Sequence, residues 1–272
     1  MNTVCKILSP VLMAGAMASS ASAATYQGTF TAATVDVFDN SPFSGTFVSV
    51  GPTGAPVFVE RGPSLSGAFG KARAELGSNG FYSTSGAAGF SAWSDGFTLM
   101  GAGGGGSGDI DISVSIHGTI IGQEADMSFG LYVSKTPFSI DSEAGLNDLN
   151  LSATLANASQ VLSYAINNAD KSPNITLTGK LNVTFGETFY VLAYLYGDVC
   201  TALEGPSHAG CTGGGQDFYH SAVFGLTAQN SASVSTLSGH AYAAAVPETE
   251  SWILAMAGLF TLPALIRRAK GV

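Results

Sequence analysis

The chain has 272 residues, of which 46% are hydrophobic, only 11% are charged and 35 are glycine. So low a charge with so many apolar residues excludes a wholly disordered chain, and glycines without a three-residue period exclude collagen. Ten basic residues against nineteen acidic ones cannot form the positive surface of a nucleic-acid-binding protein. What remains is a mid-sized globular domain with no nucleic acid among its expected partners.

The N-terminal end has the layout of a secretory signal peptide. A short basic end precedes an apolar stretch, and Ala21-Ser22-Ala23 places small residues where signal peptidase cleaves. We expect residues 1–23 to be removed by cleavage between Ala23 and Ala24 during export by the Sec machinery. The alternative is a buried N-terminal helix, which Pro10 disfavours.

The region from residue 24 to about Gly108 is rich in glycine and weakly periodic, and we interpret it as strands with long loops. Turn residues occur at Gly51-Pro52, Gly62-Pro63 and Ser78-Asn79-Gly80. The run Gly101–Gly108 lacks the Lys-Ser/Thr pair of a phosphate-binding loop and precedes a predicted strand. We interpret it as a flexible connection between strands.

Alternation of apolar and polar residues dominates the rest of the domain and predicts half-buried strands. The clearest cases are residues 109–117, 127–133, 149–155 and 175–185. Ala158–Asn168 is the one segment compatible with a short helix. Phe189–Tyr196 is apolar on both faces, which predicts a central strand with Tyr190, Tyr194 and Tyr196 at a rim or interface. Val223–Leu226 alternates again and predicts a late strand.

Many short strands, abundant turns and no strand–helix alternation predict one all-β domain from residue 24 to 245. We expect a single antiparallel β-sandwich of jelly-roll type. Its six basic residues are outnumbered by seventeen acidic ones. Such a charge favours solubility outside the cell and discourages binding to anionic lipid or DNA.

The cysteines indicate a disulfide. Cys5 leaves with the signal peptide, so Cys200 and Cys211 form the one remaining pair in an exported chain. On a chain-entropy argument, closing this loop contributes about 3 kcal/mol of stability. Two free thiols, or a metal-binding pair joined by His208, are the alternatives.

No catalytic or metal-binding motif is complete in the sequence. There is no Gly-x-Ser-x-Gly elbow, and the four histidines lack zinc-site spacing. Asp109 with Asp111, and Glu124 with Asp126, are the candidate carboxylate pairs of a glycosidase, and the first pair is also a candidate calcium site. Both pairs are typical of solvent-facing strand residues, so we predict no metal, no cofactor and no enzymatic activity.

The C-terminal end carries an apolar span. Trp252–Ile266 is uncharged over fifteen residues and is followed by Arg267, Arg268 and Lys270. At about 1.5 Å per residue it extends about 22 Å, against a hydrocarbon core of about 30 Å. We expect a short transmembrane helix, with the basic cluster in the cytoplasm and the domain outside. A buried core helix is the alternative.

Val246-Pro247-Glu248 stands shortly before this span, and the combination over residues 246–272 resembles the PEP-CTERM sorting tail of Gram-negative bacteria. Thr249 departs from the second proline usual in that motif. The resemblance implies that an exosortase, a membrane-embedded cysteine-protease-like enzyme, processes the tail. It also implies delivery to the cell surface or extracellular matrix, often alongside exopolysaccharide. An ordinary membrane anchor is the alternative.

We therefore hypothesise an exported, non-enzymatic surface or matrix protein with a structural or adhesive role and an association with exopolysaccharide. It would be anchored in the inner membrane only until its tail is processed. One alternative is a carbohydrate-binding module whose sugar site uses an exposed Trp93 and the tyrosines of Tyr190–Tyr196. A jelly-roll polysaccharide hydrolase acting through Asp109 and Asp111 is less favoured.

Overall fold

The structure is a computed structural model, and it describes residues 25–37, 45–64, 67–101, 105–121, 125–141, 155, 157–167, 172–199 and 214–245. The elements named among these residues are all strands, numbered β1 to β17 along the chain. They pair antiparallel with their neighbours. The prediction of an all-β, antiparallel domain is therefore confirmed.

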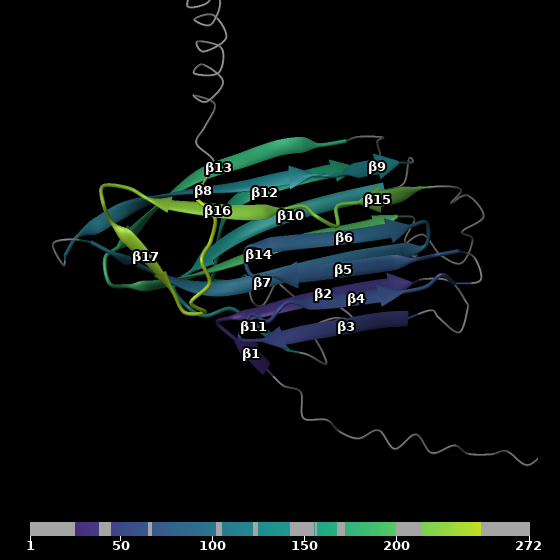
Figure 1. Ribbon diagram of the computed structural model, residues 1–272, viewed down its shortest axis with the longest axis horizontal. Helices are drawn as coiled ribbons and strands as arrows, with labels where there is room; N and C mark the ends of the chain where they lie inside the picture. The colour runs from purple at the N-terminus through teal and green to yellow at the C-terminus, as the bar shows by residue number, and fades with distance from the viewer. Residues whose placement is uncertain are drawn as a thin grey trace, which may run out of the picture.

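The strands form two large sheets (Figure 1). The seven-stranded sheet has the order β12 (Ser159–Asn167), β10 (Ala125–Ser134), β14 (Thr188–Val199), β7 (Ala87–Met100), β2 (Phe30–Val37) and β3 (Gly45–Pro52), with β17 (Ser233–Thr236) also paired to β7. The eight-stranded sheet has the order β13 (Asn174–Thr184), β8 (Ser107–His117), β16 (Val223–Ala228), β6 (Ser78–Thr84), β15 (Gly215–Asp217) and β9 (Thr119–Ile121), with β5 (Gly70–Glu75) paired to β6 and β4 (Val57–Arg61) to β5.

The inner faces of the two sheets enclose one hydrophobic core. On β8 the residues predicted to share a face, Ile110, Ile112, Val114 and Ile116, are all buried in it. The inward residues of β7, β10 and β14 belong to the same cluster. Alternate residues of a strand point to opposite faces, so this burial leaves every second residue of each strand on an outer face. The β-sandwich prediction is thus confirmed in its architecture.

Glycines on β7 and β14 shape the middle of this core. A Cβ on Gly89 would lie 2.7 Å from Cβ of Phe81, and one on Gly197 would lie 2.2 Å from Cζ of the same ring. Phe81 comes from β6 in the other sheet and is fully buried. These two glycines therefore leave the space in which a ring from the facing sheet packs.

A short ribbon covers part of the outer face of the seven-stranded sheet. It consists of β1 (Thr25–Gln27) paired with β11 (Ser139–Asp141). Phe138 and Ile140 pack there on Phe30 and Leu192 and form a second, smaller core. This part of the outer face is therefore closed to solvent.

After β17 the chain returns to the eight-stranded sheet. Figure 1 shows β17 crossing one end of the sandwich at an angle to the other strands. The amide of Leu226 on β16 donates to the carbonyl of Ala243 over 2.9 Å, and the amide of Ala245 donates to Oγ1 of Thr227 over 3.0 Å. The end of the described domain is thus attached to both sheets.

Three local predictions were wrong. Gly51-Pro52, predicted as a turn, forms the end of β3 and pairs with β2. Ala158–Asn168, predicted as a short helix, contains β12, because pairing with β10 and burial of Leu162 and Ile166 outweigh its weak helical preference. Ser78-Asn79-Gly80, predicted as a turn, lies in β6. Gly80 is needed there for close approach instead, since a Cβ would lie 2.1 Å from the carbonyl oxygen of Tyr219.

The other strands predicted from alternation are confirmed where the structure describes them. Residues 109–117 lie in β8, 127–133 in β10, 175–184 in β13 and 223–226 in β16. The central position predicted for Phe189–Tyr196 is confirmed, because β14 lies between β10 and β7. The strand predicted at 149–155 falls almost entirely outside the described residues.

Candidate functional site

Trp93 does not take part in an exposed sugar site, and that expectation was wrong. It lies on β7 opposite Ala193 of β14, faces the core and is 0% exposed. Its ring packs against those of Phe224 and Tyr242, with centroid distances of 5.2 and 5.6 Å. A ligand outside the sandwich therefore cannot reach the indole.

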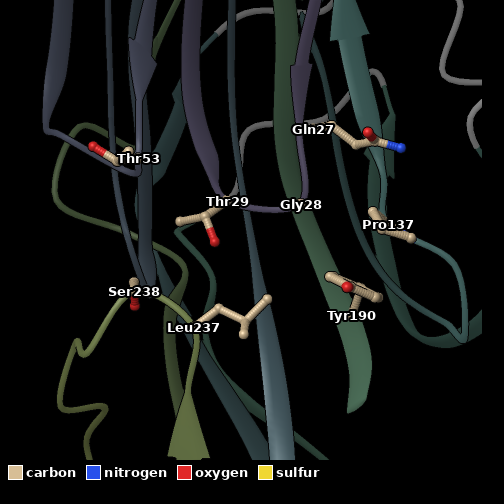
Figure 2. Close-up of a pocket in the computed structure, with 8 residues that line it drawn as sticks. All are labelled: Gln27, Gly28, Thr29, Thr53, Pro137, Tyr190, Leu237 and Ser238. Atoms are coloured by element: carbon tan, nitrogen blue, oxygen red, sulfur yellow. The ribbon is translucent and has the colours of Figure 1, made fainter.

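The three tyrosines of β14, expected at a rim or interface, lie on the outer face of its sheet, and the structure separates them. Leu192 stands between Tyr190 and Tyr194 and is fully buried under the β1–β11 ribbon. Tyr190 lies to one side of the ribbon and lines a pocket (Figure 2). Tyr194 and Tyr196 lie further along the strand, so the three rings do not form one continuous platform.

Tyr194 belongs to a stack of rings across β7, β14 and β10, which we call the tyrosine stack: Phe90, Tyr194 and Tyr132. The ring centroids are 6.1 Å apart in both steps, with interplanar angles of 17° and 20°. Gly130 lies opposite Tyr194, and a Cβ there would be 2.5 Å from Cε1 of that ring. The stack therefore lies flat on the sheet because a glycine is beneath it.

Burial, the neighbouring Tyr132 and a hydrogen bond to Tyr132 raise the pKa of Tyr194 to about 12. Burial also raises the pKa of Tyr196, helped by Asp198, Asp36 and Asp126. Burial also raises the pKa of the Asp36 carboxyl, and a hydrogen bond with the Thr46 side chain partly offsets this increase. These tyrosines are half-buried and remain protonated at neutral pH, so they suit packing and hydrogen bonding.

A second aromatic group lies on the outer face of the eight-stranded sheet, and the sequence reasoning missed it. We call it the Phe58–Tyr219 patch: Phe58, Lys71, Arg73, Tyr82 and Tyr219. Phe58 is 52% exposed. Its ring meets that of Tyr219 edge-on, at a centroid distance of 6.3 Å and an angle of 86°. Among the exposed large hydrophobic residues of the described chain, Phe58 is the aromatic one, and its contact with Tyr219 makes it part of a grouped surface, which marks a candidate contact site.

The two cations of the patch lie against its rings. The Lys71 ammonium is 4.2 Å from the ring centroid of Tyr219 and 5.3 Å from that of Tyr82. The Arg73 guanidinium is 5.7 Å from the Tyr219 centroid. Such cation–π contacts contribute about 0.5–1 kcal/mol each at exposed sites. They hold the two charges in fixed positions beside the aromatic surface.

Arg73 is held by two further partners. It forms an ion pair with Glu75 on its own strand, and it donates to Nδ1 of His220 over 3.2 Å. A guanidinium has no acceptor, so Nδ1 of His220 must accept and the ring proton sits on Nε2. Burial raises the pKa of the Tyr219 phenol, with Arg73 opposing and Glu60 adding to the shift.

The register of three strands explains the patch. Phe58 on β4 lies opposite Arg73 on β5, while Lys71 lies between Glu60 on β4 and Tyr82 on β6. Directly opposite residues share a face of the sheet, so these side chains all lie on the outer face. The acceptor Glu60 there stands next to the donor Lys71. Tyr219 reaches the patch from the β15–β16 connection because Gly80 lets its backbone approach β6.

Part of this patch had a signal in the sequence. In Gly70–Glu75 small residues alternate with Lys71, Arg73 and Glu75, which is a strand pattern with a charged outer face. The interpretation of the first third as loop-rich obscured it. The contact between Phe58 and Tyr219 joins residues far apart in the chain, and no local pattern indicates it.

The candidate carboxylates of β8 have ordinary partners. Asp109 accepts a hydrogen bond from Nδ2 of Asn182 over 2.7 Å. Asp111 accepts one from Gln229 and lies 3.9 Å from the Lys180 ammonium. Within the described ranges, no group of three or more His, Cys, Asp or Glu side chains is arranged to hold a metal ion.

Several predicted residues lie outside the described part of the chain. They are Ala23 and Ala24, Glu124, Cys200 and Cys211, His208, Val246, Pro247 and Glu248, and the span with Arg267, Arg268 and Lys270. The signal peptide, disulfide and sorting tail therefore stay predictions. Among the described residues, no helix is long and apolar enough to span a membrane.

Comparison with known proteins finds no family model that matches this chain and no similar curated protein.

Proposed function

We propose that this chain is an exported, non-enzymatic surface or matrix protein that binds polysaccharide through the Phe58–Tyr219 patch. The observation that carries the proposal is the half-exposed ring of Phe58, set edge-on to Tyr219 with two fixed cations beside it. An exposed aromatic ring packed on a partly buried one, with polar groups around them, is typical of a recognition surface.

The chemistry of the patch suits a sugar polymer. A pyranose has an apolar ring face, which stacks on an aromatic side chain, and hydroxyls that both donate and accept hydrogen bonds. Lys71 and Arg73 supply donors. Glu60, opposite Lys71, and Asp217, opposite Tyr82, supply acceptors. Because positive and negative groups alternate, the patch favours neutral hydroxyl-rich chains over strongly anionic ones.

The proposal includes a jelly-roll scaffold. Taken in chain order, the eight strands β6, β7, β8, β10, β12, β13, β14 and β16 give the orders 1-8-3-6 in one sheet and 2-7-4-5 in the other. We assign this arrangement to the jelly-roll class, an eight-strand double Greek key. The fold does not specify the ligand, so the functional argument rests on the patch.

Asp109 accepts a hydrogen bond from Asn182, and Asp111 accepts one from Gln229 and lies near the Lys180 ammonium, so both carboxylates have partners within the protein, which supports a non-enzymatic role. Sorting remains part of the proposal. Sec export with loss of residues 1–23, followed by exosortase processing at Val246-Pro247-Glu248, would bring the domain to the cell surface or matrix, where exopolysaccharide is available. The Cys200–Cys211 disulfide would form in the exported chain.

Binding is tested by co-sedimentation of the purified full chain with exopolysaccharide of the producing cells. Phe58→Ala should weaken binding about tenfold, the loss expected for one stacking ring. Met100→Ala is the matched control, because Met100 is 51% exposed and lies outside the patch. Equal binding by wild type, Phe58→Ala and Met100→Ala would contradict the proposal.

Sorting is tested separately by cell fractionation. Deleting residues 246–272 should move the protein from the surface or matrix fraction to the periplasm or medium. A double substitution of Pro247 and Glu248 by alanine should retain the unprocessed chain in the inner membrane. Unchanged surface delivery of both variants would remove the sorting part of the proposal and leave the binding part standing.

A further inference from the structure

A pocket of about 560 Å³ opens at the end of the seven-stranded sheet where β17 joins β7. Its lining residues are Gln27, Gly28, Thr29, Thr53, Pro137, Tyr190, Leu237 and Ser238 (Figure 2). The volume lies in the range of about 300–1,000 Å³ that is usual for small-molecule sites. The pocket is on the other sheet from the Phe58–Tyr219 patch, so it would be a separate site.

Asp95 fixes two of the lining residues. It is 0% exposed, and its Oδ1 accepts from the Thr29 hydroxyl over 3.1 Å, the Gly96 amide over 2.8 Å and the Ser238 amide over 3.2 Å. Its Oδ2 accepts from the Ser238 hydroxyl and from the Tyr242 hydroxyl, the latter over 2.9 Å. Five donors therefore satisfy this buried carboxylate from within the protein.

These bonds determine what the pocket offers a ligand. A hydroxyl has one hydrogen, and the hydrogens of Thr29 and Ser238 both go to Asp95. Toward any molecule in the pocket these two oxygens can only accept. Gln27 contributes an amide, which can both donate and accept. A matching ligand therefore carries hydrogen-bond donors of its own.

The walls also provide apolar surface. A Cβ on Gly96 would lie 2.4 Å from Cδ1 of Leu237 and 3.1 Å from Cε1 of Tyr190, so both side chains lie close over that glycine. Figure 2 shows the Leu237 side chain extending toward Tyr190. A Cβ on Gly28, between β1 and β2, would lie 3.6 Å from the same carbon of Tyr190. The phenol ring therefore lies over Gly96 of β7, beside the β1–β2 connection, and forms one wall of the pocket.

We propose that this pocket binds one neutral, hydroxyl-rich ring, such as a hexose unit at an end or branch of a polysaccharide. The eight described lining residues carry no charged side chain, which favours an uncharged ligand. Hydroxyls of the sugar donate to Thr29 and Ser238, and its apolar ring face packs on Tyr190. Only the source of the sugar depends on the proposed function.

Saturation-transfer NMR of the purified full chain with free glucose, galactose, mannose and glucuronic acid tests this pocket. At least one neutral hexose should bind at millimolar concentration, and glucuronic acid should bind more weakly. Tyr190→Ala and Gln27→Leu should each weaken hexose binding about tenfold. Gln27 is exposed, so its variant is expected to fold even if Tyr190→Ala does not.

Gln160→Leu on β12 is the matched control, since Gln160 is also exposed and lies away from the pocket. It should bind hexose as the wild type does, and so should Phe58→Ala. The inference is overturned if no neutral hexose binds, if Gln27→Leu binds as tightly as wild type, or if Gln160→Leu weakens binding equally. Loss of polymer binding alone in Phe58→Ala, with hexose binding retained, would support two independent sites.

Discussion

The Phe58–Tyr219 patch and the tyrosine stack lie on the outer faces of opposite sheets and use similar side chains differently. In the stack, the rings of Phe90, Tyr194 and Tyr132 lie nearly parallel on the sheet, and Phe90 is buried. In the patch, the rings of Phe58 and Tyr219 meet edge-on and Phe58 is half in solvent. The rings of the patch have a cation beside them, Lys71. On the face that carries the stack, the charged groups that raise the pKa of the neighbouring Tyr196 are carboxylates.

The difference shows what decides the role of an outer-face aromatic residue. A ring that lies over a glycine of the neighbouring strand, as Tyr194 does over Gly130, packs on the sheet and stabilises it. A ring with cations beside it and an exposed face keeps its apolar surface available to a partner. We expect the stack to contribute mainly to stability and the patch mainly to binding.

The largest effect is expected for Gly80→Ala. The new Cβ would lie 2.1 Å from the carbonyl oxygen of Tyr219, and backbone atoms cannot move aside cheaply. We expect a loss of about 3 kcal/mol in the free energy of unfolding, together with weaker polysaccharide binding because Tyr219 is displaced. Chemical denaturation and co-sedimentation measure the two. A Gly80→Ala protein with wild-type stability would show that the β15–β16 connection does not constrain the patch.

Gly130→Ala should have a smaller effect, confined to stability. Its Cβ would meet side-chain atoms of Tyr194 and Tyr132, at 2.5 and 2.9 Å, which can shift. We expect a loss of about 1–2 kcal/mol on denaturation and unchanged polysaccharide binding. If binding fell as far as in Gly80→Ala, the division of roles between the two faces would be wrong.

Lys71→Met should affect binding more than stability. It keeps most of the side-chain volume but removes the charge between the rings of Tyr82 and Tyr219. We expect about 1 kcal/mol weaker binding, the usual contribution of one hydrogen bond, because Lys71 can no longer donate to a sugar hydroxyl. Lys180→Met is the control, since this lysine is 78% exposed and pairs with Asp111 away from the patch. Equal weakening by both variants would point to non-specific charge effects.

The smallest effect concerns alkaline pH. The pKa of Tyr194 is raised from 10.0 to about 12, so the unfolded chain releases this proton before the folded chain does. Tyr194 therefore favours the folded state below about pH 10, and this contribution is lost as pH rises through about 12. Between about pH 10 and pH 12, the free energy of unfolding measured by denaturation should fall more steeply with pH for the wild type than for Tyr194→Phe. Identical curves would place the phenol in solvent.

The strands of this protein were predictable where one face is wet. Residues 109–117 and 175–184 alternate cleanly because β8 buries one face against the core and one face of β13 is partly covered. β7 gave no such signal, since almost all of its residues are buried on both faces. Without that signal, no pattern in the sequence shows that Trp93 faces the core, where the structure buries it.

The candidate site was less predictable than the fold, for a topological reason. Lys71 and Arg73 have a local pattern, but the rings beside them come from β4, β6 and the β15–β16 connection. Phe58 and Tyr219 meet only because Gly80 admits the Tyr219 backbone. No local pattern indicates the role of Asp95, because four of its five donors, from Thr29, Ser238 and Tyr242, lie far from it in the sequence.

Chemical-shift mapping with oligosaccharides prepared from the exopolysaccharide tests the central claim most directly. We predict that the aromatic signals of Phe58 and Tyr219 and the amides of Gly70–Glu75 shift on addition of the oligosaccharide. Those of Tyr132 and Tyr194 should stay in place. Shifts centred on Tyr132 and Tyr194, or no shifts in the patch at saturating oligosaccharide, would contradict the account.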